Sequence, residues 1–215
     1  MNPWNEINTS AVKGILCDLD DTLYSYDPCN KAGFEACKAF ALNEYSIGNV
    51  QFENFWKLAR EKVHQEIPEF AAGHSRLLYA LKLSGFYFGK LIPEFVLAAE
   101  EVYWSHFIDH MVWNTSAEIF LLQASEKGKK ICIVTDLTTQ IQLRKWIKLD
   151  LGRFAQFMVT SEEAGYEKPN PRIFKLALEK LNLKEHEVIM IGDSKSKDIE
   201  GATALGIKSY HIKIK

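Results

Sequence analysis

The chain has 215 residues, of which 47% are hydrophobic and 25% are charged, and its formal net charge is -2. This length accommodates one α/β domain with an inserted subdomain. The near-neutral charge gives no reason to expect binding to nucleic acid or to an anionic membrane surface.

Several features of the sequence favour a cytoplasmic protein. The first ten residues have neither a basic start nor an apolar core, so no secretory signal is visible. No apolar run reaches the ~18 residues that a membrane span needs. The four cysteines lack a metal-ligand spacing and read as reduced thiols; they are Cys17, Cys29, Cys37 and Cys132. We therefore expect a cytoplasmic monomer or homodimer without a membrane partner.

A short apolar run, Ile15 to Cys17, ends at three carboxylates. The pattern predicts a buried parallel strand with acids at its carboxyl end, where open α/β sheets bind ligands. Alternation places Asp18 and Asp20 on the same side of the chain. Two such carboxylates repel each other by about 4 kcal/mol at 4 Å with an effective dielectric of ~20, and Mg²⁺, a shared proton or solvent would relieve the repulsion. Asp21 faces the other side, and we expect it to stabilise the turn together with the Thr22 hydroxyl.

The segment after this motif has the periodicity of helices. Asp27-Pro28 is a turn signal that disfavours helix at Asp27 and marks the point where a second unit leaves the strand. Up to residue 114 the apolar spacing predicts four helices without strands, one of them ended by Gly85. An aromatic stripe on this helical subdomain, residues 26–114, is more typical of a core than of a ligand site. His74 and Arg76 are candidates for substrate contact, although a helix-surface role is commoner for such residues.

Helices and strands alternate in the remainder of the chain. We expect strands at 130–135, 154–160, 187–191 and 207–212, separated by helices at 138–149, 171–182 and 197–204 and preceded by a helix at 116–128. Such alternation requires a parallel sheet with right-handed crossovers. The predicted fold is therefore a Rossmann-like, three-layer α/β/α core, residues 1–25 and 115–215, with an inserted helical unit.

Further polar residues follow the predicted strands. They are Thr135, then Lys168 before Pro169, and then Asp193 with Asp198 beyond it. Each is commonplace alone, because strand-ending threonines, loop lysines and aspartates near helix N-termini are frequent. In this order after Asp18, however, they resemble the haloacid dehalogenase-like superfamily, in particular its phosphatases with a helical cap.

The resemblance implies roles for the acids. Asp18 would be the nucleophile that forms an aspartyl-phosphate. Asp20 would protonate the leaving alkoxide and later take a proton from water, while its backbone carbonyl binds the metal. Asp193 would ligate Mg²⁺, and Asp198 would belong to the metal site, in our interpretation through water.

The resemblance also implies how the phosphoryl group is held. Lys168 would neutralise Asp18 and the transferring group. Thr135 and the backbone amide of Asp136 would bind phosphoryl oxygens. Asp136 and Leu137 stand where asparagine and glycine are frequent in the family, so the Asp136 carboxylate would add repulsion if it pointed inward. The helical unit would be the cap that closes over the site and selects the substrate.

The function that follows is a Mg²⁺-dependent phosphatase acting on a small phosphorylated metabolite through an aspartyl-phosphate. A phosphomutase similar to β-phosphoglucomutase needs the same residues and stays open as the alternative. A 2-haloacid dehalogenase is disfavoured, because loss of halide needs no proton and those enzymes lack an acid at the position of Asp20. A catalytically silent binding protein is also disfavoured, since no required acid or lysine is missing.

Overall fold

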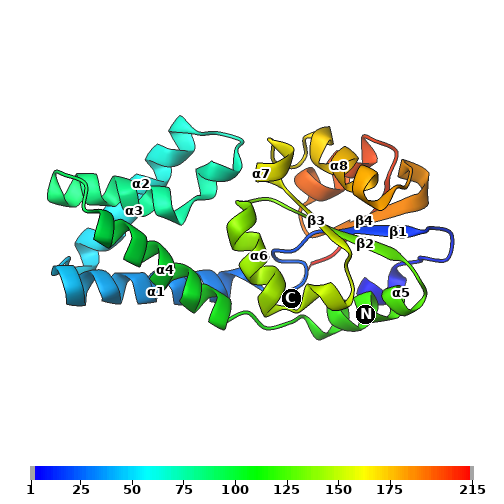
Figure 1. Cartoon of the computed structure of the whole chain (residues 1–215), viewed down its shortest axis with the longest axis horizontal. Coiled ribbons are helices and arrows are strands. Elements are labelled where there is room, and N and C mark those ends of the chain that lie inside the picture. The colour runs from blue at the N-terminus through cyan, green and yellow to red at the C-terminus, as the bar shows by residue number, and fades with distance from the viewer. Residues whose placement is uncertain (1–2, 214–215) are drawn as a thin grey trace. The chain divides into compact units, whose positions relative to one another are not determined.

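The computed structural model describes residues 3–213. The chain divides into two compact units (Figure 1). The core unit contains the chain up to Tyr26 and again from Val112, and the helical unit is Asp27–Met111. Over residues 3–213, no helix is both long enough and apolar enough to cross a membrane.

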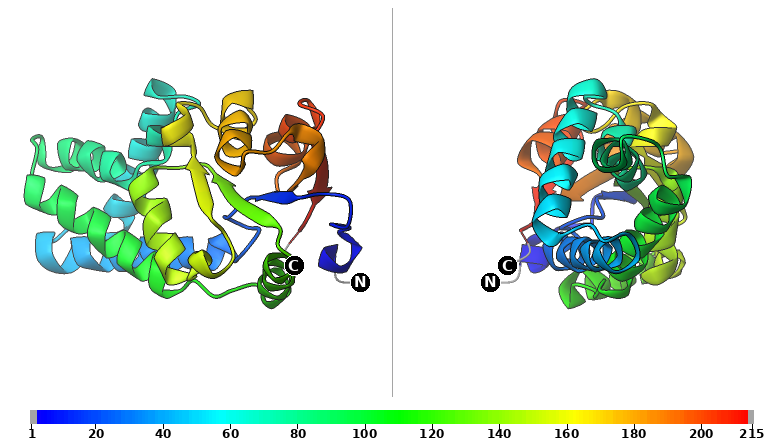
Figure 2. Two further views of the ribbon diagram at one scale, coloured as in Figure 1. Left: turned by 45° about the vertical axis from the view of Figure 1, so that its right-hand side comes forward. Right: turned by 90° about the vertical axis from the view of Figure 1, so that its left-hand side faces the viewer.

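The core unit is built on a parallel sheet with the strand order β3-β2-β1-β4-β5 (Figure 2). Leu16 on the central strand pairs with Cys132 on one side and with Met190 on the other. This strand is buried along its whole length, which explains its uninterrupted apolar sequence. The strands are β1 Gly14–Cys17, β2 Lys130–Thr135, β3 Phe157–Thr160, β4 Val188–Gly192 and β5 Lys208–His211.

Helices cover both faces of the sheet. Helix α8 packs against one face in a core that includes Leu16, Val134 and Phe174, and α5 and α6 lie on the other face (Figure 1). The helices are α5 Thr115–Glu126, α6 Thr139–Lys148, α7 Ser161–Ala164, α8 Pro171–Leu181 and α9 Gly201–Thr203, and the shorter turns are η1 Pro3–Glu6, η3 Leu151–Arg153 and η4 Glu185–Glu187. The predicted three-layer α/β/α fold is confirmed. The single helix expected at 197–204 was wrong in detail, since a π-helical segment, η5 Lys195–Glu200, precedes α9.

The helical unit contains four α-helices and, among its described residues, no strand. They are α1 Tyr26–Tyr45, α2 Asn49–Glu66, α3 Arg76–Phe88 and α4 Pro93–Asp109, with a short η2 Ala71–His74. The turn predicted at Asp27-Pro28 was wrong, because Pro28 lies in the first turn of α1, where no backbone N–H is needed. The stop predicted at Gly85 was also wrong. Helix α3 ends at Phe88 and is capped by Gly89, whose φ of 65° is the left-handed conformation that ends helices.

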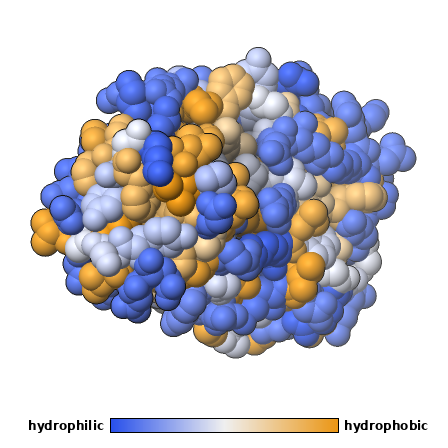
Figure 3. All heavy atoms as spheres, turned by 60° about the vertical axis from the view of Figure 1, so that its left-hand side comes forward, coloured by the Kyte–Doolittle hydropathy of each residue, from blue (hydrophilic) through white to orange (hydrophobic). Residues whose placement is uncertain are grey.

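The aromatic stripe of the helical unit forms its core, as predicted. Trp56 is 8% exposed and stacks on Tyr103, with 5.9 Å between the ring centroids. Arg76 is also buried, so the helix-surface role expected for it was wrong. Some apolar side chains of this unit remain exposed, Val50 most of all at 71%. On the face of the molecule seen in Figure 3, apolar side chains lie between hydrophilic ones.

Candidate active site

Polar side chains meet where the parallel strands of the core unit end. Asp18 directly follows β1, and its backbone N–H donates to the carbonyl of Ile191 in β4. Its buried carboxylate is held from two sides, since the Thr22 hydroxyl donates to Oδ2 at 2.8 Å and the Lys168 ammonium to Oδ1 at 2.5 Å. The Thr22 hydroxyl therefore orients Asp18, and its expected role in the turn stays a prediction. Asp21 adopts φ 58° in that turn and accepts from the backbone N–H of Tyr26, as expected of a turn residue.

Lys168 is the cation at the centre of this site. It is 4% exposed. Its Nζ donates to Asp18, to Oδ1 of Asp198 at 2.7 Å and to the carbonyl of Val134 at 3.1 Å. An ammonium has three N–H donors, and these three acceptors match them. The loop that carries Lys168 thus delivers a positive charge to two buried carboxylates.

Asp198 lies in η5 and is fully buried against the end of β4. The backbone N–H of Ser194 donates to its Oδ2 at 2.9 Å. A Cβ on Gly192 would lie 2.3 Å from this same oxygen. Glycine at position 192 therefore leaves room for the Asp198 carboxylate beside the end of β4, and the next residue, Asp193, supplies a second carboxylate.

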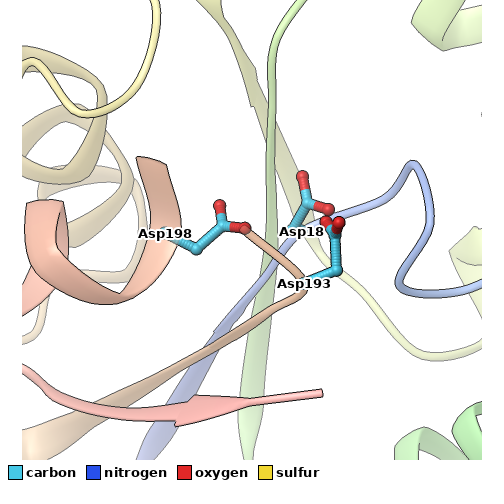
Figure 4. A group of neighbouring side chains, drawn as sticks. All are labelled: Asp18, Asp193 and Asp198. Carbon is cyan, nitrogen blue, oxygen red and sulfur yellow. The ribbon is translucent and has the colours of Figure 1, made fainter. Parts of the chain in front are cut away.

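Asp18, Asp193 and Asp198 form a candidate cation site. Their carboxylate groups offer oxygens that all lie within 4.8 Å of one another, and the three side chains point toward a common region (Figure 4). An all-oxygen set of this kind suits Mg²⁺. With all three carboxylates ionised and Lys168 counted, the cluster carries two net negative charges, which one divalent cation balances. The residues present therefore fit the metal that the sequence predicts.

The pKa values of these groups reflect burial and crowding. Burial raises the pKa of Asp18 well above its usual range, and the nearby Asp198 adds to this shift while Lys168 opposes it. Burial also raises the pKa of Asp193, with further repulsion from Asp198 and Asp21. Burial alone would lower the pKa of Lys168, but Asp18 and Asp198 outweigh it and raise the pKa instead. The carboxylates of the cluster thus lie close together where little water can screen their charges.

Asp20 has a different environment from Asp18. Lys145 on α6 donates to both of its carboxylate oxygens, at 2.7 and 2.9 Å. The Tyr24 hydroxyl donates to Oδ1, and Gln142 Nε2 lies 3.3 Å from Oδ2. Burial raises the pKa of Asp20, but Lys145, Tyr24 and Gln142 outweigh burial, and the net pKa is lowered.

The end of β2 places the two phosphate-binding candidates. Thr135 is fully buried, and Gln142 Nε2 donates to its hydroxyl at 2.6 Å. The Asp136 carboxylate is satisfied elsewhere, since it accepts from the backbone N–H of Lys168 at 3.0 Å and from Lys197 Nζ at 2.9 Å. The repulsion expected from an acid at this position is therefore offset. Binding of phosphoryl oxygens by Thr135 and by the Asp136 amide stays a prediction.

Leu137, at a position where glycine is frequent in the family, has an unusual backbone conformation. Its φ is 100°, which disfavours a residue with a side chain. The turn is held by the Ser161 hydroxyl, which accepts from the Leu137 backbone N–H at 2.9 Å. Leucine thus occupies this position with a positive φ, a conformation that glycine adopts more readily.

The two candidate substrate residues belong to the helical unit. The Arg76 guanidinium donates to the His74 carbonyl at 2.7 Å and to the Tyr103 hydroxyl at 3.0 Å, and it lies over the rings of Tyr79 and Trp104. These contacts give Arg76 a structural role within its own unit. A substrate-binding role for His74 and Arg76 stays a prediction.

Three residues of the site escaped the sequence analysis, namely Tyr24, Gln142 and Lys145. Gln142 and Lys145 are fully buried although their side chains are polar. A signal was available on α6, because both residues share a helix face with the apolar Ile141 and Leu149.

Comparison with known proteins identifies the family of the chain. The model of the haloacid dehalogenase-like hydrolases matches residues 12–206. The chain belongs to this family. Such hydrolases generally use Mg²⁺, and the aspartate cluster gives this member a place where a metal can bind.

Relatives of this haloacid dehalogenase-like hydrolase include phosphatases. It is 37% identical over 200 residues to "Ribulose-1,5-bisphosphate 5-phosphatase" of Halopiger xanaduensis, which covers 91% of this chain and 82% of the relative. It is 30% identical over 207 residues to "Glyceraldehyde 3-phosphate phosphatase" of Methanopyrus kandleri, covering 94% and 84%. The prediction of a hydrolase of the phosphatase type is thereby confirmed.

Solved structures share the fold of this family member. A 2-haloacid dehalogenase from Pseudomonas syringae pv. Tomato superposes with a TM-score of 0.74 at 23% identity, covering 92% of this chain and 85% of the other. A putative β-phosphoglucomutase from Thermotoga maritima gives 0.70 at 22% identity, covering 95% and 87%. At such identities these likenesses concern the fold alone.

Proposed function

We propose that this protein is a Mg²⁺-dependent phosphatase that hydrolyses a small phosphorylated sugar through a phosphorylated Asp18. One observation carries the proposal: Lys168 Nζ lies 2.5 Å from an Asp18 oxygen inside a buried cluster with Asp193 and Asp198. A carboxylate attacks a phosphate only where the negative charges of both are screened. This cluster offers screening by an ammonium and by a cation site.

In the first half-reaction Asp18 Oδ attacks phosphorus, and the bond from phosphorus to the leaving oxygen breaks. Thr22 and Lys168 hold the Asp18 carboxylate in place for this attack. Asp20, protonated for this step against the lowering of its pKa by Lys145, gives its proton to the leaving oxygen, so that an alcohol departs. Asp18, Asp193 and the backbone carbonyl of Asp20 would hold Mg²⁺, with Asp198 acting through water, and the cation would supply charge neutralisation for the phosphoryl oxygens.

In the second half-reaction water attacks phosphorus, and the bond between phosphorus and Asp18 breaks. Asp20, now a carboxylate, takes the proton from that water and returns to its protonated form. Inorganic phosphate leaves and Asp18 is restored. The loop amide of Asp136 and the Thr135 hydroxyl are our candidates for contacts to the phosphoryl oxygens.

The substrate class is inferred from the relatives. Ribulose bisphosphate and glyceraldehyde 3-phosphate, which their names contain, are both small sugar phosphates. We assign the same class here, with the helical unit, residues 27–111, as the cap that selects among them. A phosphomutase is the second candidate, favoured only by the fold that the chain shares with a putative β-phosphoglucomutase.

The test is a screen of sugar phosphates with release of inorganic phosphate as the readout. We expect activity with Mg²⁺, none after EDTA, and recovery when Mg²⁺ is restored. Asp18→Asn should abolish hydrolysis of p-nitrophenyl phosphate while the circular dichroism spectrum stays that of the wild type. Retention of most of the rate in Asp18→Asn would exclude the nucleophile. Isomerised sugar phosphate in place of free phosphate would instead identify a mutase.

A further inference from the structure

The ammonium of Lys145 is buried in the core unit, and the reaction described above assigns it no role. Its side chain has no exposed surface, whereas the Asp20 side chain that it contacts is 27% exposed. Lys145 therefore lies behind the acid, on the side away from solvent. Burying a lysine is costly unless its charge is compensated, so this contact is a built feature of the site.

Helix α6 contributes a second residue to the same arrangement. Gln142 lies one turn before Lys145, and its Nε2 is 2.6 Å from the Thr135 hydroxyl, 2.6 Å from the Asp136 carbonyl and 3.3 Å from Asp20. The helix thus connects the acid after β1 to the end of β2. The Tyr24 hydroxyl donates to Asp20 Oδ1, an oxygen that also accepts from Lys145.

Both Asp20 oxygens are consequently engaged by side chains of the core unit. Two contacts from one Nζ, at 2.7 and 2.9 Å, fix the plane of the carboxylate as well as its position. Proton transfer requires such placement, because donor and acceptor must come within hydrogen-bond reach.

We propose that Lys145 is a positioning residue that, with Gln142 and Tyr24, holds the Asp20 carboxyl group at the place where it exchanges protons with the leaving oxygen and with water. The inference rests on the proposed function, since it concerns the acid–base step of that reaction. Lys145 acts through Asp20 and has no contact with substrate. Loss of Lys145 should therefore lower the rate most for steps that need a proton transfer and least for steps that need none.

The test compares two phosphate esters in the full-length protein with Mg²⁺. A nitrophenolate leaves without a proton, whereas the alkoxide of glyceraldehyde 3-phosphate needs one. In Lys145→Met we expect kcat/KM for glyceraldehyde 3-phosphate to fall about 100-fold or more, and kcat/KM for p-nitrophenyl phosphate to fall by less than about tenfold. Methionine retains most of the volume beneath the Tyr24 and Tyr26 rings, which lie 5.8 Å from Nζ.

A second readout needs p-nitrophenyl phosphate alone. If water attack on the phosphorylated Asp18 is slowed, Lys145→Met should release a burst of about one equivalent of p-nitrophenol before a slow steady state. Lys148→Met is the matched control, because Lys148 is an exposed lysine on the same helix, and it should behave as the wild type. Tyr24→Phe removes only the hydroxyl and carries the test if Lys145→Met fails to fold. Like Lys145→Met, it should lower kcat/KM more for glyceraldehyde 3-phosphate than for p-nitrophenyl phosphate.

The outcomes separate the inference from the function beneath it. Equal falls in kcat/KM on both esters without a burst would mean that Lys145 merely supports the fold, and unchanged kinetics would remove any role; either result overturns the inference. A wild-type protein that cleaves neither ester with Mg²⁺ would instead refute the proposed function. If the wild type cleaves only p-nitrophenyl phosphate, the p-nitrophenol burst decides: its presence in Lys145→Met supports the inference and its absence overturns it.

Discussion

Replacing Lys168 by methionine should destabilise the metal-free protein far more than a lysine substitution usually does. Its ammonium lies 2.5 Å from Asp18 and 2.7 Å from Asp198, and all three side chains are at most 6% exposed. Solvent screens such contacts little, so the variant leaves two buried carboxylates uncompensated. Breaking a buried pair in this way costs about 3–5 kcal/mol of unfolding free energy. For a chain of this size that corresponds to a fall in Tm of roughly 6–20 °C in EDTA.

Magnesium should restore part of this loss, because a cation at Asp18, Asp193 and Asp198 supplies positive charge to the same carboxylates. At a concentration 100 times the Kd, binding adds about 2.7 kcal/mol. The assay is thermal unfolding in EDTA and in a Mg²⁺ series, with Lys197→Met as the control. The Lys197 side chain is 39% exposed and pairs with Asp136 and Glu167. Its loss should therefore lower the free energy of unfolding by about 1 kcal/mol or less. Equal stability of the two variants in EDTA would refute the electrostatic account of the site.

Three further results are expected. Gly192→Ala should abolish most phosphatase activity and weaken the Mg²⁺ response of Tm, because the new Cβ would lie 2.3 Å from an Asp198 oxygen; wild-type kinetics would show that the β4 end has room. Asp136→Asn should keep activity within about tenfold, since an amide oxygen still accepts from the Lys168 backbone and the Lys197 pair is partly exposed; a loss as large as that of Asp18→Asn would contradict this. Thiol titration with Ellman's reagent at pH 8 should detect no rapid reaction in the folded protein, because all four cysteines are buried and burial raises the pKa of Cys37 and of Cys132 to about 12 each; rapid modification of either would refute it.

The sheet could be predicted because each of its strands carries its own signal. The apolar run of β1 ends at Asp18, and Asn170-Pro171 marks the start of α8 as expected from capping chemistry. Helix limits were less predictable where one residue type has two uses. Proline suits a turn and also the first turn of a helix, where Pro28 lies, and Gly85 lies inside α3 while Gly89 caps it. Only the backbone conformation, a φ of 65° at Gly89, separates the two glycines.

The site divides in the same manner between residues that motifs reveal and residues that only packing reveals. Asp18 and Asp193 directly follow β1 and β4, so the predicted strands locate them. Lys145 lies within a helix, where a lysine in sequence normally indicates the solvent face, and its partner Asp20 is 125 residues away. Pairing over that distance depends on which face of α6 the sheet covers. A polar residue that recurs on the apolar face of a helix therefore predicts a buried partner, and in a parallel sheet the carboxyl ends of the strands are the first place to look for it.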